Sequence, residues 1–357
     1  MSVLLPALTA FLALVMAIAL LDQWLERRQP FQLVWAIGMT FFGIASGCEA
    51  LAAAGSWNEA LYRTWYLTGA VLTAGWLGLG TALLLAKTRF GYAIALSIFL
   101  AGLFTLLTQR RFNYEGAGST PMLYFIGAGL LALAIAVETY FQNERWPMFM
   151  AIGVGVASVV AIFLTITVPL AAPFSIDPAT GQPSADLYVG GVVAGTNVPG
   201  SLRLLTPFLN ITGGFALAFG ALFSAYVFMP KRRVLPYSLD PNQKGDHFLF
   251  NLIIAIPALI VNFVASLPGA LRELVRGRLH SRVPATLLIA AGGFVASAGD
   301  SLNRFGVTGP FAVAKFIAVV LLLAGFLVSI EAFREVRIPF TRVRLARVRH
   351  EPEQGTA

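Results

Sequence analysis

Apolar stretches of about twenty residues recur along the whole chain, and short polar segments separate most of them. None alternates apolar and polar residues, as a membrane-spanning β-strand would. Each stretch is long enough as a helix to cross, or nearly cross, a hydrocarbon core of roughly 30 Å. Because backbone polar groups in lipid must pair within their own segment, the pattern predicts an all-α, polytopic membrane helical bundle. The stretches lie near residues 3–21, 31–53, 64–86, 91–108, 121–141, 147–170, 204–229, 247–266, 286–303 and 310–333.

The composition supports this class. The chain is 57% hydrophobic and only 12% charged, well outside the usual range of soluble domains. No basic segment precedes the first apolar stretch and no A-x-A-like site follows it before Asp22, so we expect a first membrane helix and not a cleaved signal peptide. Residues 1–333 are therefore predicted to form a single membrane-embedded domain, followed by a basic cytoplasmic tail at 334–357.

The distribution of Lys and Arg predicts how the chain is oriented, because basic residues collect on the cytoplasmic side. The entire net charge of +8 lies in residues 230–357. With nine crossings and the N-terminus outside, 19 of the 25 basic residues lie in the cytoplasm, whereas ten crossings divide them 14 to 11. We predict a prokaryotic inner membrane or plasma membrane protein with a cytoplasmic C-terminus and a long extracytoplasmic loop at 171–203.

Segment 230–284, predicted to be cytoplasmic, decides between these two counts. Its apolar stretch contains Asn251, Pro257 and Asn262, and it continues without a break into a basic amphipathic region. This pattern predicts a re-entrant hairpin or an interfacial helix. A proline-kinked tenth span is the alternative.

The C-terminal tail carries six arginines between residues 334 and 349, which alternate with apolar residues. Basic residues directly after a last crossing favour anionic headgroups, each by about 1 kcal/mol. Membrane lipids are therefore the predicted partner of the tail. The chain has no nucleic-acid-binding motif, and orientation in the membrane already explains its pI of about 9.9. A membrane-protein partner or a homo-oligomer stays open.

Two stretches near opposite ends of the chain share the pattern A-S-x-x-[DE]-x-L-x-x-x-G at an offset of 251 residues. The copy at 45–55 contains Glu49, and the copy at 296–306 contains Asp300. Each copy ends an apolar stretch, and a cation follows near the start of the next one, Arg63 in the first case and Lys315 in the second. This suggests an internal repeat of the kind found in transporters, with polar groups at the repeat interface.

In the predicted topology these groups approach the outer surface together. We therefore predict an outward-facing polar pocket, covered by the loop at 171–203. Alternatively, Glu49 with Arg63 and Asp300 with Lys315 form structural salt bridges near helix ends, where long side chains reach the interface. The candidate ligand-binding residues are Glu49, Arg63, Tyr66, Asn210, Asp300, Arg304 and Lys315.

The sequence contains few motifs that would indicate catalysis or cofactor binding. The chain has no phosphate-binding loop, no H-E-x-x-H and no G-x-S-x-G. Its three histidines and single cysteine form no recognisable haem or metal ligand set, so we predict no enzyme activity, cofactor or metal site. Aromatic residues near the ends of the stretches are interpreted as an interfacial belt, namely Trp24, Trp35, Trp57, Tyr62, Trp65, Tyr66, Tyr140 and Trp146.

Two functions remain. The first is binding or transport of a small molecule or ion through the outward-facing pocket. The second is a non-catalytic, sensor-like or accessory subunit of a larger membrane complex. A polar cavity reaching the membrane midplane would favour transport, whereas tightly paired, dry Glu49 and Asp300 beside a broad apolar seam would favour the accessory role.

Overall fold

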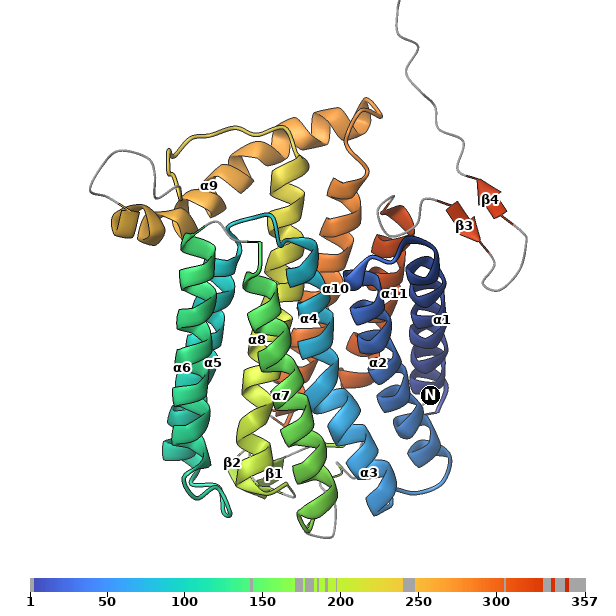
Figure 1. Ribbon diagram of the computed structural model, residues 1–357. Helices are drawn as coiled ribbons and strands as arrows, with labels where there is room; N and C mark the ends of the chain where they lie inside the picture. The colour runs from blue at the N-terminus through green and yellow to red at the C-terminus, as the bar shows by residue number, and fades with distance from the viewer. Residues whose placement is uncertain are drawn as a thin grey trace, which may run out of the picture.

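In the part of the chain that the structure describes, ten helices are long and apolar enough to cross a membrane, and they pack as a bundle (Figure 1). The all-α, polytopic prediction is therefore confirmed. The computed structural model describes residues 3–141, 144–170, 176, 183–184, 186–189, 192–196, 198–239, 248–304, 306–329, 335–337 and 344–346.

Each predicted apolar stretch corresponds to a helix, and several helices extend beyond it by a turn or more. The segments α3, a π-helix and α4 form one continuous helical run over Glu59–Leu84. The helices are α1 Leu4–Arg27, α2 Pro30–Ala54, α3 Glu59–Trp65, the π-helix Tyr66–Leu72, α4 Thr73–Leu84, α5 Gly91–Phe112, α6 Thr120–Tyr140, α7 Trp146–Thr167, α8 Gly200–Phe228, α9 Phe248–Val275, α10 Arg282–Arg304 and α11 Phe311–Val328. Two short antiparallel pairs lie outside the helices, β1 Asp186–Val189 with β2 Val192–Thr196, and β3 Glu335–Arg337 with β4 Arg344–Ala346.

Six helices surround one buried core. In the order α1, α2, α4, α8, α10 and α11, each helix packs on the next, and α11 packs back on α1. The core between them includes Met16, Met39, Leu77, Leu217 and Val319, which come from five of the six helices. The ring is therefore closed by contact between the first and last membrane helices of the chain.

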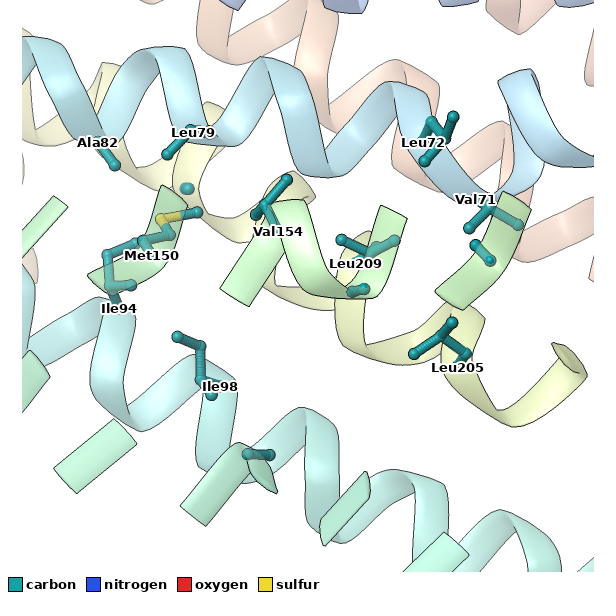
Figure 2. Packing of buried hydrophobic residues seen from close by; sticks show 14 of the residues in the cluster. Val71, Leu72, Leu79, Ala82, Ile94, Ile98, Met150, Val154, Leu205 and Leu209 are labelled. Atoms are coloured by element: carbon teal, nitrogen blue, oxygen red, sulfur yellow. The ribbon is translucent and has the colours of Figure 1, made fainter. Parts of the chain in front are cut away.

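Helices α5, α6 and α7 flank the ring beside α4 and α8. A second apolar cluster fills this junction, and Figure 2 shows Leu79 of α4, Ile94 of α5 and Met150 of α7 within it. Leu205 and Leu209 of α8 extend the cluster along the same interface. The flanking helices are therefore held mainly by apolar packing.

Helices α4 and α8 approach each other at two glycines. A Cβ on Gly78 would meet the backbone of Gly213, and a Cβ on Gly213 would meet the carbonyl of Ala74. Small residues let membrane helices pack backbone against backbone. This contact has no room for any larger residue.

Helix α9 is a single continuous helix, so the segment is not a hairpin. It lies across the upper end of the bundle in Figure 1, where α8 ends and α10 begins, while the other long helices run along the bundle. Its length and composition would also allow a crossing. Its orientation in Figure 1 is the one expected for the interfacial form of the prediction.

The aromatic-belt interpretation is wrong for five of its eight residues. Trp35, Tyr62, Trp65, Tyr66 and Trp146 are all buried inside the bundle. The Trp35 Nε1–H donates to the Leu77 carbonyl at 3.1 Å, and the Trp146 Nε1–H donates to the Ala86 carbonyl at 3.0 Å. A buried indole needs such an acceptor, and here the bundle supplies it.

We expect Gly213→Ala to destabilise the protein by about 1–3 kcal/mol, since the added methyl group overpacks a backbone contact. Gly127→Ala on α6 is the matched control, because a Cβ there meets nothing within 4 Å. Alanine forms helices better than glycine, so this control should be neutral or slightly stabilising. Thermal unfolding in detergent measures both variants, and equal behaviour would contradict the close α4–α8 contact.

Candidate functional site

Glu49 is the centre of a buried polar cluster. It lies in the last two turns of α2, and one of its oxygens, Oε1, accepts two hydrogen bonds. The Lys315 ammonium of α11 donates to it at 2.7 Å, and the Trp65 indole N–H of α3 also donates at 2.7 Å. The side chains of Glu49 and Lys315 are only 3% and 10% exposed. A single carboxylate oxygen therefore links three helices.

Aromatic rings complete the surroundings of Lys315. Its ammonium lies 5.5 Å from the centroid of the Phe42 ring and 5.2 Å from that of Phe311. A cation over a desolvated aromatic face gains about 2 kcal/mol. These contacts offset part of the cost of removing an ion pair from water.

The predicted pairing of the charged residues is wrong. Glu49 pairs with Lys315 and not with Arg63, and Lys315 is therefore not the dedicated partner of Asp300. Arg63 instead binds Glu59 one turn earlier on α3, at 2.6 Å. The acid of the first motif copy thus meets the cation that follows the second copy.

Arg63 also caps a neighbouring helix. Its Nη1 group donates to the carbonyl of Thr165 in the last turn of α7, and to the carbonyl of Val168 at 2.9 Å. The last carbonyls of a helix lack partners within the helix and carry partial negative charge. The guanidinium satisfies them, so Arg63 lies outside the Glu49 cluster.

The loop between α7 and α8 is fastened to the same end of the bundle. The Tyr62 hydroxyl of α3 donates to the Ser184 carbonyl at 2.6 Å. The Asn303 amide of α10 donates to the neighbouring Pro183 carbonyl at 3.0 Å. These bonds attach residues 183 and 184 of the loop to α3 and α10, while residues 171–175, 177–182, 185, 190–191 and 197 lie outside the described residues.

A second group of polar contacts lies where the π-helix faces α8. The hydroxyls of Tyr66 and Thr206 are 2.9 Å apart, and the Asn210 amide donates to the Ala70 carbonyl at 2.8 Å. A π-helical turn changes the backbone hydrogen bonding and is frequent at functional sites. Here it leaves the Ala70 carbonyl accessible to a side chain of α8.

Three buried polar atoms on α8 lack a hydrogen-bond partner within the described part of the chain, namely Asn210 Oδ1, Thr212 Oγ1 and Ser224 Oγ. Thr212 lines a cavity of about 10 Å³ beside the α4–α8 contact. This volume holds roughly one water molecule. Thr212 has the only polar side chain of the lining, which otherwise consists of Gly75, Ile98, Leu131, Met150, Val154, Phe208, Leu209 and Gly213.

The remaining candidate residues are placed as follows. Asp300 lies half-buried near the end of α10, and Arg304 is the last residue of α10, with a side chain outside the described part. The structure thus joins Glu49 to Lys315 and places Tyr66 and Asn210 at the interface with α8. It does not bring all seven residues to one pocket.

The two motif copies differ in their surroundings. Ser46 is fully buried, whereas Ser297 is exposed. Gly306 has a φ of +80°, whereas Gly55 has a φ of −129°. The internal-repeat prediction therefore gains no support.

Neither a metal site among the described residues nor a similar protein indicates what this cluster of polar residues does. Among the residues that the structure describes, no three His, Cys, Asp or Glu side chains come together to hold a metal ion. Comparisons of the chain with protein-family models, curated proteins and solved structures give no match. The functional argument therefore rests on the geometry alone.

We expect Glu49→Gln to destabilise the protein by about 3–5 kcal/mol, because it leaves the Lys315 ammonium buried without a counter-charge. Glu59→Gln also removes the acid of an ion pair, but the Glu59 side chain is 60% exposed. It should therefore cost no more than about 1 kcal/mol. Thermal unfolding in detergent compares the two, and a Glu49 variant as stable as the Glu59 variant would show that the buried pair is not structural.

Proposed function

We propose that this multi-pass membrane protein is a non-catalytic module, a sensor-like or accessory subunit of a larger membrane complex. The observation that carries the proposal is the closed Glu49 cluster, in which the carboxylate binds Lys315 and Trp65 and is almost fully buried. This pair links α2 to α11. A solute site would need these charges to face the solute or water.

The lipid-exposed helices support the same proposal. In the most apolar 18-residue segment of α6 only 22% is buried, compared with 56% in the corresponding segment of α2. Exposed side chains on α6 include Leu123, Leu130 and Leu133, and on α7 they include Val159 and Phe163. This face is the broad apolar seam expected of an accessory subunit, and it could pack against a second membrane protein.

The test combines a solute screen with site-specific cross-linking. We expect that no ion, amino acid, sugar or quinone raises the thermal stability of the wild type more than that of the variant Glu49→Gln/Lys315→Gln.

A photoreactive group at Leu130 of α6 should form a discrete adduct in native membranes. The matched position Phe11 on α1, which is similarly exposed, should not. A solute that stabilises only the wild type would contradict the proposal.

Binding or transport of a small polar solute is the second candidate. The unpaired Asn210 Oδ1 and Thr212 Oγ1 favour it, because they lie beside the π-helix and a small cavity. If the module proposal holds, Thr212→Val removes a buried hydroxyl without a partner and should be neutral or stabilising by about 1 kcal/mol. A solute that protects the wild type but not Thr212→Val would favour transport instead.

A further inference from the structure

Helix α9 is amphipathic in the opposite sense to a helix on the surface of a soluble protein. Its buried face is small and polar, and its exposed face is apolar. The buried residues follow helical spacing and are Ala255, Ala258, Asn262, Ser266 and Ala270. The exposed stripe does the same on the other side and consists of Ile253, Ile256, Ile260, Val264, Leu267, Leu271 and Leu274.

Two polar side chains fix this orientation by binding the backbone that follows α8. Asn262 Oδ1 accepts from the backbone N–H of Val234 at 2.7 Å and from that of Leu235 at 2.9 Å. Its Nδ2 group donates to the Leu235 carbonyl at 2.8 Å. Ser266 Oγ accepts from the backbone N–H of Arg232 at 2.9 Å. The helix cannot turn its apolar stripe inward without breaking these four bonds.

The apolar side chains of this stripe are more exposed than is favourable for a surface in contact with water. Ile253 is 73% exposed, Ile260 60% and Leu271 61%. A continuous row of such side chains in water is unfavourable, whereas the same row in acyl chains is favourable. The geometry of α9 therefore fits a helix whose outer face lies in lipid.

Positive charge surrounds this helix. Lys231, Arg232 and Arg233 are exposed in the segment that Asn262 and Ser266 bind. Arg272, Arg276 and Arg278 are exposed at the C-terminal end of α9, where Glu273 is their one acidic neighbour on that helix end. Exposed basic residues next to an apolar face match the headgroups of an anionic bilayer leaflet.

We propose that α9 lies in the plane of the membrane, with its apolar stripe in the acyl layer and its arginines on anionic phospholipid headgroups. Helix α8 ends and α10 begins at the end of the bundle where α9 lies (Figure 1), as an in-plane helix requires. This inference is independent of which proposed function is correct. It assigns a lipid-binding surface to the basic end of the bundle.

Cysteine labelling tests the placement directly. In a Cys48→Ala background, Arg232→Cys labels the chain before α9 and Arg278→Cys labels the chain after it. Lys87→Cys and Ser56→Cys mark the two ends of the bundle and are both exposed. With an impermeant maleimide and sealed vesicles, we expect positions 232 and 278 to label from the same side as position 87. Labelling of position 278 together with position 56 would show that α9 crosses the membrane.

Fluorescence quenching tests the lipid contact. A bimane group at Ile260→Cys should be quenched by lipids with doxyl-labelled acyl chains, whereas one at Arg233→Cys should not. Doxyl-labelled phosphatidylglycerol should quench Ile260→Cys at several-fold lower content than doxyl-labelled phosphatidylcholine. Replacing Arg272, Arg276 and Arg278 by Gln should remove this preference. No quenching, or a disulfide-linked dimer through position 260, would overturn the proposal.

Discussion

The burial of one carboxylate constrains how this bundle closes. Glu49 lies inside the helices, where an unpaired charge would cost several kcal/mol. Its cation, Lys315, comes from a helix 266 residues later in the chain. Satisfying Glu49 therefore requires α11 to dock beside α2. This requirement matches the closed ring, in which α11 packs back against α1.

Other contacts at the same end of the bundle follow from this arrangement. The Trp65 indole N–H donates to the carboxylate, and Tyr62 and Asn303 donate to the carbonyls of the loop residues Ser184 and Pro183. The opposite end is organised differently, with α9 lying across it (Figure 1). One end of the bundle is thus fastened by buried polar contacts, and the other carries an apolar, basic surface.

The sequence predicts the helices well, because the length of an apolar stretch is a local property. The prolines and arginines in the sequence also single out α9, the helix that lies across the end of the bundle (Figure 1). It does not predict the partner of Glu49, because Arg63 is nearer in the sequence and the choice depends on the neighbouring helices. Arg63 is already bound by Glu59 and by the end of α7.

Two further features lay beyond sequence reasoning for related reasons. In the sequence, Trp65 resembles an interfacial tryptophan. The folded structure shows instead that its indole N–H donates to the Glu49 carboxylate. The amino-acid composition of Tyr66–Leu72 does not distinguish this π-helix from an ordinary α-helix. Its Ala70 carbonyl accepts a hydrogen bond from the Asn210 amide of α8. Both features arise from contacts between helices and not from either helix alone.

A double-mutant cycle between Glu49→Gln and Lys315→Gln tests the central claim most directly. The free energies of unfolding of the wild type, both single variants and the double variant give the coupling between the two side chains. A structural ion pair predicts a coupling of about 2 kcal/mol or more, so that the double variant loses less stability than the two single variants lose together. Additivity within about 0.5 kcal/mol would show that the pair does not hold α2 and α11 together.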